Sequence, residues 1–189
     1  MTVESLHRVF TRIPTLETDR LCLRKIRIED ASDMFSYSSS ADVTKYLLWY
    51  PHEDLHYTEQ YIEYLQERYA VGDFYDWAIV LKENNRMIGT CGFTNFDLTN
   101  NSAEIGYVLH SDYHGNGYAA EAARCVIAFG FDSLELTRIS AICMTENKAS
   151  LRVMQKCGMV QEGIMRSAVF AKGEHRDVIV SAILASDAR

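Results

Sequence analysis

The segment from Ala103 to Arg124 constrains the fold more than any other part of the 189-residue chain. Its first part, Glu104 to Leu109, is short, apolar and β-prone, which predicts a buried strand. A loop containing Gly115 and Gly117 follows, and a run of strong helix formers begins at Ala119. A strand, a glycine loop and a helix bring backbone N–H groups to the positive end of a helix dipole. This arrangement predicts a phosphate or pyrophosphate site, held mostly by main-chain amides because the loop has no lysine.

Taken alone, the loop allows more than one interpretation. It is compatible with a simple helix entry that binds nothing, because loops with two glycines are common. Gly115-x-Gly117-x-x-Ala120 also satisfies the dinucleotide fingerprint G-x-G-x-x-A, which would indicate a nicotinamide-dependent reductase. That fingerprint usually needs a second mononucleotide half, and too few residues follow Glu146, the acid that would end the next strand. A third interpretation depends on two neighbouring segments.

His114-Gly115-Asn116-Gly117-Tyr118-Ala119 resembles the coenzyme A loop of the GNAT superfamily of N-acetyltransferases, Gln/Arg-x-x-Gly-x-Gly/Ala, with His at the first position. Residues 145–159 (TENKASLRVMQKCGM) resemble its second signature, N-x-x-S-x-x-x-x-x-K-x-G-F/M. Ala103 to Tyr107 is similar to the strand entry of the ribosomal-protein-alanine acetyltransferase (RimJ/RimL-like) branch. Because the likeness extends from roughly Leu16 to Leu184, the chain is identified as a member of this superfamily.

Composition limits the classes of function. Apolar residues make up 48% and charged residues 24% of the chain, as in a soluble globular domain. No apolar run approaches the roughly 20 residues needed to cross a bilayer, and residues 1–10 lack a signal-peptide core, so we expect a cytoplasmic protein with no membrane contact. The net charge of −7 disfavours nucleic acid and suits a cationic amine or basic peptide. The five scattered cysteines, without a C-x-x-C pair, predict neither disulfides nor a metal site.

Periodicity predicts a mixed α/β (α+β) sheet with helices on its faces, formed by a single domain over residues 16–189. We expect residues 1–15 to be a loosely held lead-in that packs on a partner subunit, which leaves a homodimer open. The resemblance implies the GNAT acyl-CoA N-acyltransferase fold, with a central, mostly antiparallel seven-stranded sheet. It also implies a V-shaped opening between strands four and five and helices on both faces. The predicted strands and helices fall at residues 18–24, 28–38, 58–70, 77–81, 87–96, 104–109, 119–131, 136–144, 147–157, 160–170 and 176–184.

Acetyl transfer from a thioester to an amine needs a base, an N–H donor for the carbonyl oxygen and a proton for the departing thiolate. Glu104 is the candidate base, because it is the ionisable residue at the start of an otherwise apolar strand, although an exposed strand-end acid would look the same. The backbone N–H of Val108 or Leu109 is the candidate donor. The resemblance implies that Ser150 or a tyrosine is the acid, although Ser150 could bond the coenzyme instead. The tyrosines close to the segment are Tyr107, Tyr113 and Tyr118.

The resemblance also implies which residues bind the coenzyme. Asn147 would contact its pantetheine arm, but the same oxygen would be occupied if Asn147 only caps its helix at Ser150. A covalent role for Cys143 or Cys157 is disfavoured, since neither has an adjacent His and no acyl-enzyme is needed. The implied loop contacts are His114, Gly115, Asn116, Gly117, Tyr118, Ala119 and Ala120.

Trp49, Tyr50 and Trp77 are candidates for the wall of the acceptor pocket, although aromatic residues packed over the core would give the same pattern. The predicted function is an N-acetyltransferase that moves an acetyl group from acetyl-CoA to a primary amine by direct attack in a ternary complex, without a metal. The acceptor would be a protein N-terminal α-amine, ribosomal in that branch, or alternatively a polyamine, amino acid or antibiotic. A non-catalytic CoA-binding module is disfavoured by the presence of both Glu104 and Ser150.

Overall fold

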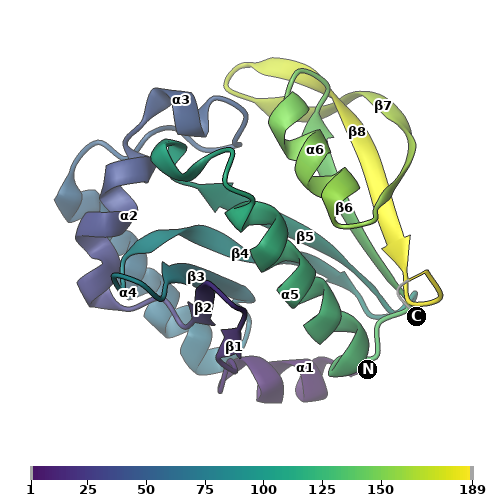
Figure 1. Cartoon of the computed structure of the whole chain (residues 1–189), viewed down its shortest axis with the longest axis horizontal. Helices are drawn as coiled ribbons and strands as arrows, with labels where there is room; N and C mark the ends of the chain where they lie inside the picture. The colour runs from purple at the N-terminus through teal and green to yellow at the C-terminus, as the bar shows by residue number, and fades with distance from the viewer. Residues whose placement is uncertain (1, 188–189) are drawn as a thin grey trace.

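An eight-stranded mixed sheet is the centre of the computed structural model, which describes residues 2–187 (Figure 1). The strands lie in the order β1-β2-β3-β4-β5-β6-β8-β7, and only β5 and β6 pair in parallel. The predicted mixed α/β class is therefore confirmed, with one strand more than expected because β1 is a separate two-residue strand. The bounds are β1 (Leu16–Glu17), β2 (Leu21–Arg24), β3 (Asp76–Leu81), β4 (Met87–Asp97), β5 (Ser102–Leu109), β6 (Arg138–Met144), β7 (Val160–Ala171) and β8 (Glu174–Leu184).

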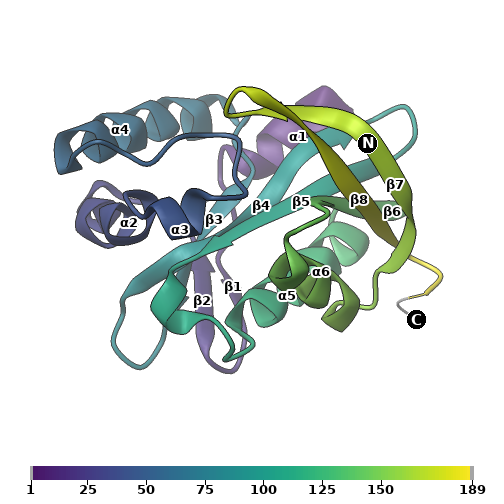
Figure 2. The ribbon, with the colours of Figure 1, turned by 90° about the horizontal axis from the view of Figure 1, so that it is seen from above.

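Helices cover both faces of this sheet (Figure 2). Helices α2 and α4 lie over one face, and α5 and α6 lie over the other. Residues of β3 alternate between the two faces, so Ala78 and Val80 pack under α2 and α4 while Ile79 packs under α5. The helices are α1 (Val3–Phe10), α2 (Ala31–Ser38), α3 (Ala41–Thr44), α4 (Leu55–Val71), α5 (Tyr118–Asp132) and α6 (Lys148–Lys156), with short 3₁₀ turns at Ile28–Asp30 and Ser111–Tyr113.

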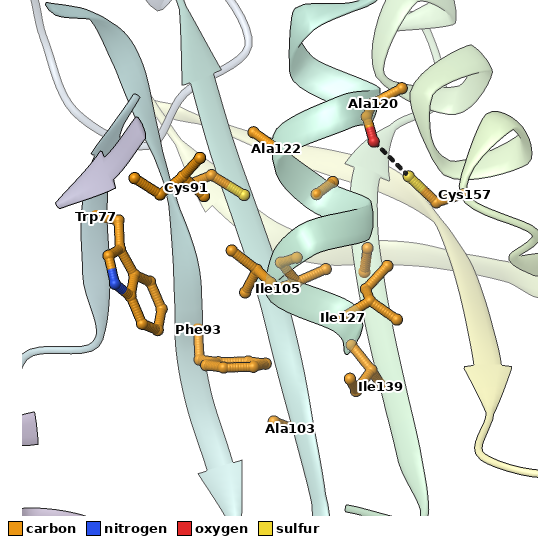
Figure 3. Packing of buried hydrophobic residues seen from close by; sticks show 14 of the residues in the cluster. Trp77, Cys91, Phe93, Ala103, Ile105, Ala120, Ala122, Ile127, Ile139 and Cys157 are labelled. Atoms are coloured by element: carbon orange, nitrogen blue, oxygen red, sulfur yellow. Dashed lines mark hydrogen bonds between the residues drawn. The ribbon is translucent and has the colours of Figure 1, made fainter. Parts of the chain in front are cut away.

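Small residues let α5 approach the sheet closely. Ala120, Ala122 and Ala123 are buried in the cluster that also contains Ile105 and Cys91. In Figure 3, Ala120 lies next to Cys157, whose Sγ donates to its carbonyl oxygen. At Gly130, an added Cβ would come within 2.7 Å of Ile139 Cδ1, so a larger residue would push the helix away. Because α5 begins directly after the glycine loop, this packing also fixes where that loop lies relative to β5.

The N-terminal segment is part of the core, so the expectation of a loosely held lead-in is wrong for residues 3–10. These residues form α1, which Thr2 caps by accepting a hydrogen bond from the Ser5 N–H. Leu6 and Phe10 lie one turn apart on one face and are 3% and 0% exposed. The Phe10 ring packs against Trp77, with centroids 5.6 Å apart.

Strands β5 and β6 separate after a short paired segment. They pair only at Ser102–Arg138, Ala103–Ile139 and Glu104–Ser140, while β6 continues along β8 from Arg138 to Met144. The diverging strands are visible in Figure 1. The rest of β5 therefore has a free edge, and the predicted V-shaped opening begins at Glu104.

Candidate active site

A cavity of about 920 Å³ lies where β5 and β6 separate. Its walls come from β3, β4, β5 and β6, from α4 and α6, and from the segment Tyr46–Glu53. This volume is within the range of sites that enclose small molecules. Four carboxylates line it, and none of its described lining residues is a lysine or arginine. Asp73 is paired with Arg68 at 2.6 Å, whereas Glu53, Asp76 and Glu104 have no ion-pair partner within residues 2–187, an arrangement that favours a cationic ligand.

Glu104 lies at the point of separation and lines the cavity, as the sequence predicts for a base. Its Oε1 accepts a hydrogen bond from Thr94 Oγ1 at 3.0 Å. Thr94 lies in an irregular part of β4, where the register with β5 shifts between Phe93 and Asn95. Within residues 2–187, Oε2 of Glu104 makes no hydrogen bond, so this oxygen is free to accept a proton from a ligand.

Tyr107 and Ser150 form one hydroxyl pair on the opposite side of β5. Tyr107 Oη lies 2.9 Å from Ser150 Oγ and donates to the Ser150 carbonyl at 3.0 Å. Burial raises the pKa of the Tyr107 phenol, so it remains protonated at neutral pH. Both side chains line the cavity, whereas Tyr113 and Tyr118 do not. The two kinds of acid that the sequence left open, a serine and a tyrosine, thus lie side by side.

The positions of Glu104 and Tyr107 show how the cavity crosses the sheet. Side chains three positions apart on a strand point to opposite faces. Glu104 therefore lies on the face covered by α2 and α4, and Tyr107 on the face of α5 and α6, where it contacts Ser150. Because the cavity includes both residues, it passes through the gap between β5 and β6.

Asn147 is the N-cap of α6, and its Oδ1 accepts a hydrogen bond from the Ser150 N–H at 3.0 Å. The oxygen is thereby occupied by the helix, as the capping alternative predicts. The Asn147 amide nitrogen makes no hydrogen bond within residues 2–187, and the residue lines the cavity. Any contact with a ligand therefore uses the Asn147 NH₂ group as a donor.

The glycine loop before α5 has the backbone predicted for a phosphate site. Gly115 and Gly117 have φ angles of +81° and +84°, which residues with a Cβ rarely adopt. The backbone N–H groups of residues 115–120 donate no hydrogen bond within residues 2–187. A Cβ at Gly115 would meet nothing within 4 Å, so the main chain is accessible there. These open amides at the start of a 15-residue helix fit a diphosphate.

None of residues 114–120 lines the 920 Å³ cavity, so the loop and the cavity are separate parts of the site. His114 Nε2 lies 2.9 Å from the Leu109 carbonyl oxygen, and this hydrogen bond attaches the loop to the end of β5.

Arg20 supplies a cation to the loop that sequence reasoning missed. Its Nη1 donates to the Asn116 carbonyl at 3.2 Å, and its guanidinium lies 4.3 Å from the centre of the Tyr118 ring. Arg20 comes from the turn between β1 and β2, about a hundred residues away, so no local pattern could indicate it.

The hydrogen-bond alternation of β5 distinguishes the two candidate backbone donors. The His110 N–H donates to the Ile88 carbonyl in β4 at 2.8 Å. In an antiparallel pair every second residue faces the same neighbour, so the Val108 N–H also faces β4 and the Leu109 N–H faces the open edge. Leu109, rather than Val108, therefore carries an N–H on the side where β6 has separated.

Trp49 and Tyr50 line the cavity, but the expectation for Trp77 is wrong. Trp77 is fully buried on the α5 face, where its Nε1 donates to the Pro14 carbonyl at 2.7 Å. The preceding residue, Asp76, points to the other face and lines the cavity instead. Burial raises the pKa of Asp76 to about 7, so this missed carboxyl titrates near neutral pH.

The segment Tyr46–Glu53 is held by His52, and α3, the helix just before it, is held by the β7–β8 hairpin. His52 is 9% exposed, and its Nδ1 lies 2.8 Å from Thr58 Oγ1 of α4. Lys172, at the tip of the β7–β8 hairpin, donates from Nζ to the Thr44 carbonyl in α3 at 2.6 Å. The hairpin thereby reaches across from the far side of the opening (Figures 1 and 2).

Residues 2–187 contain neither a metal-binding cluster nor a membrane-spanning helix. No group of three or more His, Cys, Asp and Glu side chains there is placed to hold a metal ion. No helix in this part of the chain is both long and apolar enough to span a membrane.

Comparison with known proteins agrees with this geometry. Residues 20–160 match the family model described as an acetyltransferase (GNAT) domain. The chain belongs to the GNAT acetyltransferase family. It is 38% identical over 170 residues to an uncharacterised N-acetyltransferase, p20, from Bacillus licheniformis, an alignment that covers 90% of this chain and 96% of the relative. This GNAT enzyme is therefore an N-acetyltransferase, and members of its family use acetyl-CoA.

Solved structures show the same fold. A GNAT-family acetyltransferase from Bacillus anthracis superposes with a TM-score of 0.82 at 29% identity, covering 92% of this chain and 99% of the other. A more distant neighbour at 20% identity and a TM-score of 0.76 is RimL, a ribosomal L7/L12 α-N-protein acetyltransferase in complex with coenzyme A. The match covers 90% of this chain and 98% of RimL.

Proposed function

We propose that this GNAT enzyme transfers the acetyl group directly from acetyl-CoA to a primary amine, with Glu104 as the base. The observation that carries the proposal is that one cavity passes between β5 and β6 and includes both Glu104 and the Tyr107–Ser150 pair. A proton acceptor and a proton donor on opposite sides of one opening suit a ternary complex. In such a complex the amine approaches from one face and the thioester from the other.

Each candidate residue then has a separate role. Acetyl-CoA supplies the thioester carbonyl that the amine attacks. The free N–H groups of residues 115–120 would bind its diphosphate, with Arg20 adding a positive charge, and the Asn147 amide would donate to the pantetheine arm. Glu104 accepts a proton from the incoming ammonium, and the Leu109 N–H donates to the carbonyl oxygen. The Tyr107 hydroxyl, with Ser150, supplies the proton that the departing sulfur takes up.

The first candidate acceptor is a protein N-terminal α-amine. It is supported by the substrate printed for the RimL neighbour and by the exposed aromatic residues of the cavity, since Trp49 and Tyr50 are 36% and 67% exposed. Exposed rings beside a cavity are suited to peptide binding. The second candidate is a small cationic amine, which is favoured by the carboxylates that line the cavity without a lysine or arginine.

A thiol-release assay tests the proposal. The enzyme is mixed with acetyl-CoA and, in turn, peptides with a free α-amine, the same peptides with a blocked N-terminus, and small primary amines. We expect thiol release with at least one free amine, acetylated product by mass spectrometry, and none with the blocked peptides. Thiol release at the same rate without any amine would contradict direct transfer, and so would its complete absence across the panel.

A further inference from the structure

A second carboxylate lies on the same face of the sheet as Glu104. In the sheet register Asp76 pairs with Gly92, and Gly92 pairs with Gly106, which places these residues in one row across β3, β4 and β5. Glu104 is two positions from Gly106 along β5 and therefore shares its face. All four residues line the cavity. The sheet positions between the two carboxylates are thus both glycines.

The glycines are required for this arrangement. A Cβ at Gly92 would lie 2.8 Å from Asp76 Oδ1, so a side chain there would displace the carboxylate. A Cβ at Gly106 would lie 2.7 Å from Thr94 Cγ2, next to the group that holds Glu104. Neither position therefore places a side chain between the two carboxylates.

Asp76 lacks the cationic partner that a buried carboxylate normally has. Its Oδ1 accepts a hydrogen bond from the Trp77 N–H at 3.1 Å, and no ion pair to it is present within residues 2–187. The titratable groups around it are Tyr37 of α2, Tyr61 and Tyr69 of α4, and Cys91 of β4, all neutral at pH 7 because burial raises their pKa values. A bound ammonium would supply the missing charge and favour the ionised form of Asp76.

We propose that the acceptor is a small diamine, whose non-reacting ammonium binds Asp76 while its other nitrogen lies at Glu104. This inference rests on the proposed function and specifies its substrate class. Neighbouring strands lie about 4.8 Å apart and rise about 3.3 Å per residue, so the two Cα atoms are roughly 12 Å apart. With both side chains turned toward the ligand, the two nitrogens would be roughly 6–9 Å apart, the length of a diamine with about four to six methylenes.

The reaction balances with the groups already named. The amine nitrogen at Glu104 forms a bond to the thioester carbonyl carbon, and the carbon–sulfur bond breaks. The nitrogen enters as an ammonium and loses two protons, the first to Glu104 before the attack and the second as the amide forms. The sulfur takes up one proton from the Tyr107–Ser150 pair, which regains it from solvent, so one proton is released per turnover. The ammonium at Asp76 keeps its three protons, so the product is a mono-N-acetylated diamine with one remaining positive charge.

The test compares putrescine and cadaverine with butylamine and pentylamine, which have the same chain lengths and one nitrogen. We expect the wild-type kcat/KM to be about 10- to 100-fold higher for the diamines, the range for a charge-assisted contact. Asp76→Asn should reduce the kcat/KM for the diamines to the value for the monoamines. The kcat/KM for the monoamines and the KM for acetyl-CoA should not change. Glu63→Gln, which removes an exposed charge from α4 outside the cavity, is the matched control and should behave as wild type.

Equal rates for diamines and monoamines in the wild type would overturn the inference. An equal loss for both classes in Asp76→Asn would also overturn it, because Asp76 would then act in chemistry or folding. If no amine is acetylated, the proposed function fails, and calorimetric titration of putrescine in the presence of coenzyme A still decides the inference. Binding to wild type that is lost in Asp76→Asn supports the diamine site, and no binding to wild type rejects it. Circular dichroism of each variant checks that it is folded.

Discussion

The coenzyme side and the acceptor side of this enzyme are built in different ways. The proposed coenzyme side consists mainly of one continuous segment, β5, the glycine loop and the start of α5, whose groups are backbone N–H donors, with Arg20 and Asn147 adding side chains from other elements. The acceptor side combines side chains from the segment Tyr46–Glu53, from α4 and from β3. Backbone sites depend on loop geometry and leave a local sequence motif, whereas side-chain sites assembled from distant elements leave none.

The largest expected effect is at Glu104, where the two sides meet. Glu104→Gln keeps the shape of the side chain and its contact with Thr94 but removes the proton acceptor. We expect kcat to fall about 100- to 1,000-fold, the usual contribution of a general base. The KM for acetyl-CoA should not change, because no coenzyme contact is lost. Steady-state kinetics at pH 7 measures both, and an unchanged kcat would remove Glu104 from the chemistry.

The coenzyme side can be tested through a glycine. Gly117→Val places a β-branched residue at a φ of +84°, which costs about 1–3 kcal/mol and distorts the loop. We expect acetyl-CoA to bind about 10- to 100-fold more weakly, as measured by calorimetric titration. Gly163→Ala is the matched control, because Gly163 does not have a positive φ and its Cβ would meet nothing within 4 Å. Equal affinities for the two variants would argue against a backbone-held diphosphate.

The Tyr107–Ser150 pair should show a smaller, coupled effect. Tyr107→Phe and Ser150→Ala each remove one hydroxyl from a hydrogen bond of 2.9 Å. We expect kcat to fall about tenfold in each, and the double variant to lose less than the product of the two losses, because the hydroxyls act as a unit. Pre-steady-state thiol release measures the chemical step. Fully multiplicative losses would mean that the two residues act independently.

The smallest expected effect is a change in stability at Asp76. Its folded-state pKa of about 7 is above the ordinary value of 3.8, so between these pH values only the folded protein binds the proton. The free energy of unfolding therefore decreases as pH rises through this window, because the buried carboxyl must ionise. An asparagine does not ionise, so the variant does not lose this stability. We expect Asp76→Asn to raise Tm by roughly 2–6 °C at pH 8 and by much less at pH 4. Thermal unfolding across pH measures the difference, and a constant offset would show that Asp76 is not the titrating group.

Sequence reasoning succeeded where the determinants are local. The strand before the loop, the positive φ angles of Gly115 and Gly117, and the helix capped by Asn147 all follow from neighbouring residues. Glu104 was identifiable as a candidate because it is the ionisable residue at the start of an otherwise apolar strand, and the structure places it in the cavity.

Sequence reasoning failed where the position of a residue depends on which face of the sheet it points to, or on a contact with a distant part of the chain. Strand β3 is apolar after its first residue and is covered on both faces, so no alternation shows that Trp77 enters the core and Asp76 the cavity. Helix α1 has only eight residues, too few for its Leu6–Phe10 pair to stand out before Phe129 and Trp77 are known to be its neighbours. Arg20 reaches the loop only because β1 and β2 form an edge next to α5.

The hydrogen bond from Lys172 to the Thr44 carbonyl limits how far the opening between β5 and β6 can widen. Strands β5 and β6 are joined at one end of the opening by three residue pairs, and at the other end this bond joins the β7–β8 hairpin to α3. A ligand can fill the enclosed space without disturbing either attachment, but a bulkier one must break the ammonium–carbonyl contact to enter. The tip of one hairpin can thus act as a size filter for the amines that reach the thioester.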